Sequence, residues 1–495
     1  MIERLEALDG LGAEIAARAA RAGVLAVWRT QLRSVRRVVV RAGRTEESTS
    51  AVFSGHGVQV RTAEGRMALA SRDGLDPLPA LRLLDRAADA TRSGESLGVA
   101  SSADADLPVV VARSVPSGLE AFEETEAPAV AARLAEIERE VAAAAPGVRL
   151  RLTWVSDLDA WRVLRSDGTD VLYAMPRAVL RAAATTDGDG SRHSIGASVA
   201  GPDPRLAWNE RLAGLFLRRA VAAARLAREL PDALVHPAGC PPLVIDYTLA
   251  KGLAHEAFGH AAEADGFRSS VLARDGRYRT GERVGADRVS IVDEPIPGDH
   301  AWQPYGPNGL VRERAAIVDR GALADALADP WSAAASGVAA RGSERAESYR
   351  SAPLPRMSNI RIEVADPLPA PGSFEDYGAA ELRDLLSAAG VFRRHAAVSW
   401  LSGYTGGQVN TATGDFVFHC KAIRRITRDG DVLHRPAIFS GSMFGALAAI
   451  REAFGPLALD AIGTCGKWGQ NVPSSGGSHF FLVLDPDPSF RLGGS

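Results

Sequence analysis

The segment His255-Glu256-Ala257-Phe258-Gly259-His260 contains two histidines, with a glutamate directly after the first. Neutral imidazoles are good zinc ligands, and a carboxylate beside them can act as a general base. Just before this segment, the apolar run Leu243-Val244-Ile245 predicts a short buried strand. Asp246 can then cap a helix that extends to about Asp265. We therefore expect a strand followed by a helix that presents a hydrolytic zinc site.

The spacing of the two histidines requires a distortion of that helix. In the familiar zinc pattern H-E-x-x-H, the histidines stand about 40° apart around the helix. Here they are five residues apart, which corresponds to about 140° on a regular α-helix. A π-bulge, or a helix opened locally at Gly259, would bring both imidazoles to one ion. A metal site at this position therefore predicts irregular backbone between His255 and His260.

The motif has a structural alternative. The chain has 10 histidines, and the pattern H-E-x-x-x-H arises by chance in roughly one such chain per hundred. Two histidines on a half-buried helix are more often structural than metal-binding. The metal interpretation therefore depends on the other motifs of the chain.

The sequence on the two sides of this helix differs in pattern. Residues 1–235 alternate helical and strand patterns, including an amphipathic helix that starts at Pro128 and a long helix that ends before Pro231. Residues 236–495 show mostly short strand patterns, with one further helix near residues 379–388. We predict an α+β fold. An N-terminal domain with helices and an antiparallel sheet precedes a β-rich C-terminal domain that carries the histidine helix.

Composition excludes several classes of function. Lys+Arg 57 against Asp+Glu 60 gives a net charge of -3, so nucleic acid and anionic membranes are not expected partners. Three cysteines among 495 residues are too few for a disulfide framework. The N-terminus lacks the order of a signal peptide, and the most apolar stretch, residues 437–450, is too short to span a bilayer. We expect a cytoplasmic protein.

Several separated motifs resemble those of the TldD/PmbA metalloprotease family. The H-E-x-x-x-H segment is followed by an acidic tail, Glu263-Ala264-Asp265, as in that family. The resemblance covers about Leu243 to Val483, and its further motifs follow in family order: Pro353-Leu354-Pro355-Arg356-Met357-Ser358-Asn359, Gly406-Gly407-Gln408-Val409, Thr413-Gly414-Asp415-Phe416-Val417-Phe418 and Gly463-Thr464-Cys465-Gly466-Lys467. The N-terminal half is similar only in general pattern and length.

The resemblance implies the remaining parts of the site. Cys465 is the expected third zinc ligand, beside His255 and His260, and Glu256 is the expected base. A thiolate suits zinc, and three protein ligands leave a fourth position for water. Glu263 is expected to hold the imidazole of a histidine ligand, with Glu263 itself and His479 as weaker ligand candidates. Three further residues are candidates for contacts with the substrate or around the site: Arg356, Asn359 and Trp468.

The function implied is a zinc-dependent peptidase that hydrolyses short or unfolded peptides. The complete motif implies the zinc-bearing subunit of a homodimer, or of a heterodimer with a TldE/PmbA-like subunit. Residues 305–309, residues 474–478 and Trp468 depart from the family pattern and leave a second reading open. In that reading the same site hydrolyses an amide in a peptide-derived natural-product precursor. A non-catalytic partner with structural zinc is the third reading, against which the intact Glu256 argues.

Overall fold

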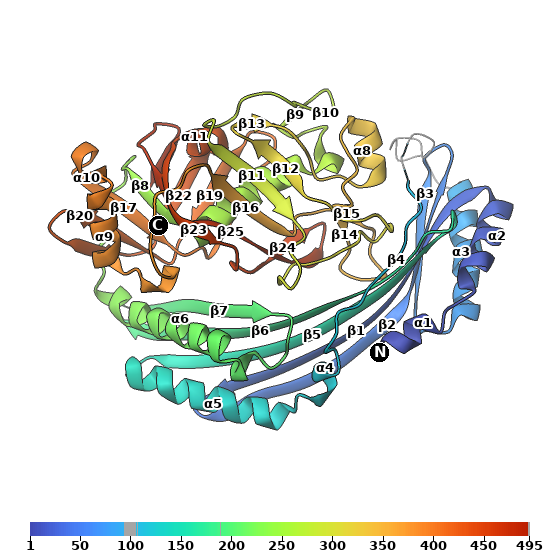
Figure 1. The fold of residues 1–495 in the computed structure, drawn as a ribbon, viewed down its shortest axis with the longest axis horizontal. Coiled ribbons are helices and arrows are strands. Elements are labelled where there is room, and N and C mark those ends of the chain that lie inside the picture. Colours follow the sequence, from blue (N-terminus) through green and yellow to red (C-terminus); the bar gives the residue numbers. More distant parts are fainter. Residues whose placement is uncertain (94–104, 106, 189, 494–495) are drawn as a thin grey trace.

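The N-terminal part of the chain is built on one long curved sheet (Figure 1). The computed structural model describes residues 1–93, 105, 107–188 and 190–493. The strands of this sheet run in the order β3-β2-β1-β5-β6-β4, and β7 pairs with β6. All pairs are antiparallel except β4 with β6. The strands are β1 (Val24–Arg41), β2 (Arg44–Thr62), β3 (Met67–Asp73), β4 (Val111–Ser114), β5 (Arg149–Arg165), β6 (Asp170–Gly188) and β7 (Ser191–Gly201).

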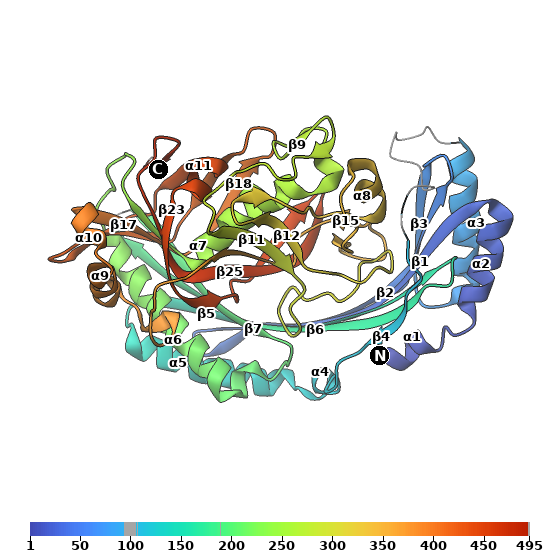
Figure 2. The same ribbon diagram turned by 45° about the horizontal axis from the view of Figure 1, so that its top comes forward.

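Helices cover the outer face and the ends of this sheet (Figures 1 and 2). Apolar residues of α5 and α6 pack against alternate residues of β5 and β6 in one core, which includes Leu134, Trp154 and Phe216. The opposite, concave face turns toward the C-terminal part of the chain. The helices are α1 (Ile2–Glu6), α2 (Leu11–Ala22), α3 (Pro77–Ser93), α4 (Ala121–Glu124), α5 (Ala127–Ala144) and α6 (Glu210–Glu229), with the 3-10 turns Leu206–Trp208 and Leu230–Asp232.

The C-terminal part is rich in strands and centres on an 11-stranded sheet. Its main order is β13-β12-β11-β16-β25-β8-β17-β20-β21, and β23 and β24 also pair with β25. The strands are β8 (Leu243–Asp246), β11 (Val289–Glu294), β12 (Ala315–Asp319), β13 (Ala322–Leu323), β16 (Asn359–Val364), β17 (Ala397–Ser402), β20 (Ala422–Thr427), β21 (Asp431–His434), β23 (Ile450–Ala458), β24 (Gly463–Lys467) and β25 (Gln470–Leu484).

Smaller sheets complete this part. A four-stranded sheet has the order β18-β19-β22-β26, and two strand pairs, β9 with β10 and β14 with β15, lie in the connections. Their bounds are β9 (Ala273–Arg274), β10 (Arg277–Tyr278), β14 (Glu344–Arg345), β15 (Leu354–Pro355), β18 (Gly406–Asn410), β19 (Asp415–His419), β22 (Ile438–Ser442) and β26 (Phe490–Leu492). The predicted α+β class, with a β-rich C-terminal part, is confirmed.

The C-terminal part has more helices than the single further helix expected. That helix is present as α9 (Ala379–Ala388), but α8 (Pro330–Ser336), α10 (Val391–Arg394) and α11 (Met443–Ala448) are also formed, with a 3-10 turn at Phe374–Asp376. These helices are too short to show an amphipathic period. α8 is fixed locally, because Asp329 accepts hydrogen bonds from the amides of Trp331 and Ser332. Among the described residues, no helix is long and apolar enough to cross a membrane.

Candidate metal centre and adjoining cavity

The helix that carries the two histidines is regular at its start and distorted at its centre. It begins as α7 (Tyr247–Gly252), where the Asp246 carboxylate accepts hydrogen bonds from the amides of Thr248 and Leu249 at 3.0 and 2.9 Å. It continues as a π-helix over Leu253–Gly259 and ends in a 3-10 turn, His260–Ala262. The amide of His260 donates to the carbonyl of His255, which is the i→i+5 bond of a π-turn. The predicted cap and the predicted distortion are both confirmed.

Close packing at Gly259 shows why this helix needs a glycine at that position. A Cβ atom there would lie 2.7 Å from Sδ of Met357 and 3.1 Å from Cδ1 of Ile360. Both neighbours are fully buried, so a larger residue would push the helix away from β16. The missing side chain of Gly259 lets the distorted turn lie directly against the sheet.

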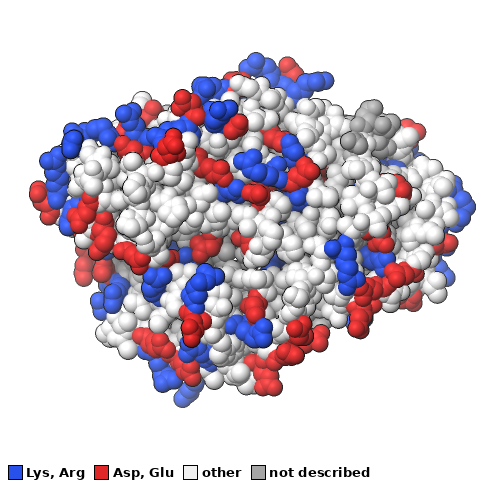
Figure 3. Space-filling view, viewed as in Figure 1, with Lys and Arg blue, Asp and Glu red and all other residues white. Residues whose placement is uncertain are grey.

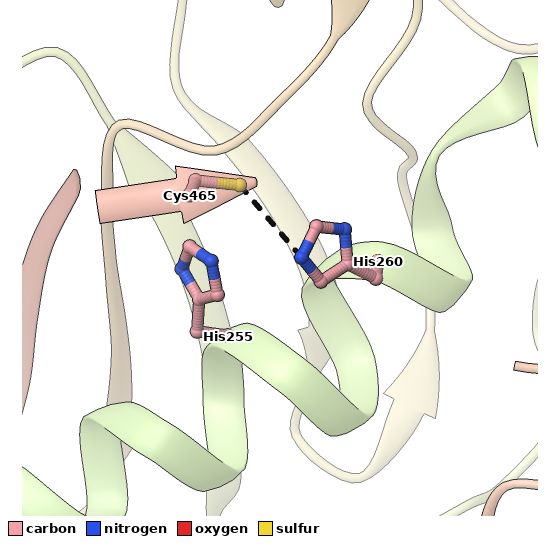
Figure 4. Close-up of side chains that lie close together, drawn as sticks. All are labelled: His255, His260 and Cys465. Carbon is pink, nitrogen blue, oxygen red and sulfur yellow. Dashed lines mark hydrogen bonds between the residues drawn. The ribbon is translucent and has the colours of Figure 1, made fainter. Parts of the chain in front are cut away.

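His255, His260 and Cys465 meet at one point (Figure 4). One potential ligand atom from each lies within 4.8 Å of the others. Sγ of Cys465 is 3.7 Å from Nε2 of His260, and the two imidazole rings stand nearly perpendicular, at 88°. Cys465 comes from β24, whose hairpin with β25 places it opposite Val472. The structure thus brings the three expected ligands together from segments 205 residues apart.

The chemistry of the donor atoms fits a zinc ion. Nδ1 of His255 is buried and has no hydrogen-bond partner among the described residues, although buried polar atoms are normally satisfied. Burial, with Lys251 next in importance, holds the pKa of His255 well below its usual value, so the ring is neutral, as a metal ligand must be. An N, N, S donor set is one that zinc accepts, and it leaves a fourth position open.

Glu263 orients the second histidine, as expected. Its Oε2 atom lies 3.2 Å from Nδ1 of His260, which leaves Nε2 facing Cys465. Burial alone would lower the pKa of His260, but the Glu263 carboxylate and the Cys465 sulfur together raise it well above its usual value. Lys467 in turn ion-pairs with Glu263 at 2.9 Å and with Asp265 at 2.7 Å. This charged group lies on the side of His260 away from the other two ligands.

Glu263→Gln should weaken zinc binding by about 10- to 100-fold, the usual cost of losing a partner that holds a metal-bound histidine. The amide keeps the size of the side chain but loses the charge that the Nδ1 proton faces. Competition with a chromogenic chelator would measure the change. An unchanged zinc affinity would show that Glu263 serves only to pair with Lys467.

Arg356 lies beside the cluster and is fully buried. Its Nε atom donates to Sγ of Cys465 at 3.2 Å, and Nη2 donates to the carbonyl of Cys465. These two hydrogen bonds hold Cys465 in place beside the two histidines. The structure therefore places Arg356 around Cys465 and not in the wall of a substrate cleft.

Three other candidates lie away from the cluster. Asn359 is buried and donates to the Leu459 carbonyl at 3.0 Å. Trp468 is 78% exposed, because it occupies the hairpin turn with a positive φ of 49°. Both ring nitrogens of His479 meet backbone groups, the Gly455 carbonyl at 2.7 Å and the Val364 amide at 3.2 Å. His479 therefore has no free nitrogen for a metal, and the prediction that it is a possible ligand is wrong.

A cavity of about 1360 Å³ adjoins the metal centre. It lies between the concave face of the N-terminal sheet and the C-terminal part, with walls from β5, β6, β7, α6 and the loop after β17. Glu256 lines it, and Oε2 of Glu256 is 3.8 Å from Nε2 of His260. Asn359 and Trp468 are not among the lining residues. The carboxylate therefore faces both the cluster and the space where a substrate would lie.

Tyr404 is a site residue that the sequence did not reveal. Its hydroxyl donates to Oε1 of Glu256 at 3.0 Å, and its ring packs against Gly252, where a Cβ atom would lie 2.7 Å away. Burial, together with the neighbouring Glu256, raises the pKa of Tyr404, so the phenol keeps its proton. The only available signal was its position two residues before the Gly406-Gly407-Gln408-Val409 motif.

Comparison with known proteins places this fold among named metalloprotease relatives. Residues 239–464 match the model of the PmbA/TldA metallopeptidase C-terminal domain. A protein of Archaeoglobus fulgidus named as a metalloprotease is 32% identical over 50% of this chain and 53% of its own length. A metalloprotease TldD homolog of Haemophilus influenzae is 27% identical over 63% and 61%. A zinc metalloprotease TldD homolog of Saccharolobus solfataricus is 27% identical over 49% and 50%.

Solved structures extend the likeness to the whole chain. TldE from Thermococcus kodakarensis has a TM-score of 0.74 over 99% of this chain and 100% of its own, at 13% identity. That level of identity shows the fold alone. In sequence, the chain spans about half the length of the curated relatives it matches, 53% and 55% for the first two. The C-terminal part of the chain is similar to the TldD/PmbA family, and the whole chain shares the fold of TldE.

Proposed function

We propose that the protein is a zinc-dependent peptidase in which His255, His260 and Cys465 hold the metal. The observation that carries the proposal is the meeting of these three donors with Glu256 at the edge of a large cavity. Relatives named as metalloproteases, one of them as a zinc metalloprotease, support it. A site with only a structural role has no use for a carboxylate that faces both the ligands and the cavity.

The residues of the chain divide the chemistry between them. Zinc at such a site supplies Lewis acidity, which lowers the pKa of water and polarises a carbonyl. Glu256 lies where it can accept the proton of an attacking water and later donate it to the leaving amine. Arg356 holds the side chain of Cys465 in place, and Glu263 contacts Nδ1 of His260 so that Nε2 faces the other ligands.

Tyr404 positions the base. Tyr404→Phe removes the hydrogen bond to Oε1 of Glu256 without changing the ring that packs on Gly252. We expect kcat to fall by about tenfold, the effect of one charge-assisted hydrogen bond, with KM and zinc content unchanged. Steady-state kinetics on a quenched fluorescent peptide would test this. A rise in KM at constant kcat would instead assign Tyr404 to substrate binding.

Assembly and substrate range stay predictions from the family resemblance. The expected dimer, with itself or with a TldE/PmbA-like subunit, would be measured by light scattering of the purified chain. Comparing unmodified peptides with modified, natural-product-like amides would separate the two hydrolase interpretations.

A further inference from the structure

The cavity beside Glu256 is lined by more basic than acidic side chains. Nine Lys and Arg residues line it against five Asp and Glu residues, although the whole chain has a net charge of -3. Basic and acidic side chains are interspersed over the outer face seen in Figure 3. The excess of positive charge in the cavity is therefore not a sample of a generally basic surface.

Most of the acidic groups in the wall are already neutralised. Arg219 ion-pairs with Glu375 at 2.6 Å and with Asp460 at 2.9 Å. Glu229 pairs with Arg424 at 2.7 Å. The fourth, Asp246, caps α7 through backbone amides. Of the five lining carboxylates, Asp246 and Glu256 thus have no ion pair with a lysine or arginine of the described residues, and Glu256 is the one that also faces the metal-binding cluster.

Four of the lysine and arginine residues that line the cavity have no carboxylate partner in an ion pair among the described residues. Arg181 on β6, Arg225 on α6, Lys251 on α7 and Lys421 before β20 line the cavity, and none pairs with a carboxylate of the described residues. Lys251 is only 5% exposed, and its Nζ contacts the hydroxyl of Ser474 at 3.1 Å. Nζ of Lys421 donates to the Gly196 carbonyl at 2.7 Å. Buried or confined cations without counter-charges are costly.

The strand register gathers positive charge on the concave face of the sheet. Arg181 lies opposite Thr153 on β5, and Arg151 lies two residues from Thr153 on the same face. Arg37 lies on the neighbouring strand opposite Val155. Two of these three arginines have carboxylate partners. Glu46 pairs with Arg151 at 2.6 Å, and Glu47 pairs with Arg37 at 3.4 Å. Arg181 is therefore the one of the three without an ion pair among the described residues. Desolvation and the nearby Arg37 lower the pKa of Arg181, the direction expected for a cation beside a like charge. An anionic ligand would relieve this repulsion.

We propose that the cavity selects acidic peptides, whose carboxylates Arg181, Arg225, Lys251 and Lys421 bind while Glu256 faces the scissile bond. This inference rests on the proposed peptidase function and names the substrate class. A cleft of one sign, with walls of low dielectric constant, concentrates ligands of opposite charge. Both aspartate or glutamate side chains and a free C-terminal carboxylate supply this chemistry.

Binding should be measured apart from hydrolysis. The zinc-loaded Glu256→Gln variant would be titrated with fluorescent peptides of equal length that carry central Glu, Gln or Lys residues. Each would be made with a free and with an amidated C-terminus. We expect the Glu peptide to bind at least tenfold more tightly than the Gln peptide, with an affinity that falls as salt is added. Loss of the preference on amidation would assign it to the terminal carboxylate, whereas its persistence would assign it to the side chains.

Arg181→Gln and Arg225→Gln should each reduce the Glu-over-Gln preference by about three- to fivefold, the scale of a partly exposed ion pair. Arg228→Gln is the matched control, because Arg228 lies one turn from Arg225 on α6 and does not line the cavity. Circular dichroism would establish that all three variants fold.

Equal binding of the Glu, Gln and Lys peptides would overturn the inference, and so would an equal effect of Arg228→Gln. A single-stranded oligonucleotide of matched charge that displaces the Glu peptide at lower concentration would also overturn it. The wild-type enzyme separates the two proposals. Hydrolysis of all peptides at equal rates would reject the acidic preference and keep the peptidase, whereas selective binding without any hydrolysis would reject the peptidase alone.

Discussion

Glu256→Gln should lower peptide hydrolysis by about 10²- to 10⁴-fold while zinc stays bound, because an amide cannot accept the proton of the attacking water. The substitution preserves size, and its nitrogen and oxygen can still meet the Tyr404 hydroxyl. The carboxylate is not among the three clustered ligands, so the metal centre should be unaffected. Single-turnover hydrolysis and zinc content by mass spectrometry would be measured on the same preparation.

A Glu→Gln change elsewhere provides the control. Glu140 is exposed on α5, on the outer face of the sheet, and Glu140→Gln should hydrolyse peptides at the wild-type rate. Undiminished turnover in Glu256→Gln would refute Glu256 as the base. Loss of zinc together with activity would instead make Glu256 part of the metal-binding set.

Local features of the site could be predicted from the sequence because they depend on neighbouring residues. Asp246 precedes an apolar helical pattern, so its role as cap follows from helix chemistry alone. The five-residue spacing of His255 and His260 excludes a regular α-helix at a shared metal, and the π-helix satisfies that geometric condition. Both predictions involve at most a few turns of backbone.

Features that depend on distant strands could not be predicted in this way. Cys465 meets His260 across 205 residues, and only the resemblance to a known family pointed to it. Tyr404 reaches Glu256 because β17 lies parallel to β8, the strand that leads into the helix. Trp468 and His479 illustrate the converse case. Their residue types fit a site, but the hairpin turn exposes one and backbone groups occupy both nitrogens of the other.

The positive charge of the cavity could not be predicted from composition either. A net charge near zero correctly describes the whole chain, yet it averages over ion pairs that cancel and cations that do not. Arg181 and Arg225 come from a strand and a helix more than 40 residues apart, and the packing of α6 against β6 and β7 brings them to one cavity. The positive charge of the cavity therefore depends on which elements the fold brings together, which composition does not describe.

Cys465→Ala should weaken zinc binding by more than the 10- to 100-fold cost of losing an outer partner, because it removes a ligand itself. It would also abolish hydrolysis. At a zinc concentration about 1,000 times the wild-type Kd, bound metal stabilises the folded chain by about 4 kcal/mol. A 1,000-fold weaker Kd would reduce this to about 0.4 kcal/mol. Thermal unfolding with and without zinc would therefore show a large metal-dependent shift for the wild type and almost none for the variant.

The remaining cysteines test whether the effect belongs to the cluster. Cys240 is exposed and lies outside it, so Cys240→Ala should keep the full thermal shift. If Cys465→Ala keeps stoichiometric zinc, the third ligand is a different group. Glu256 is then the nearest remaining candidate, because its Oε2 atom lies 3.8 Å from Nε2 of His260, the nitrogen that faces Cys465. A Cys465→Ala, Glu256→Gln double variant that loses zinc would establish that substitution of one ligand for the other.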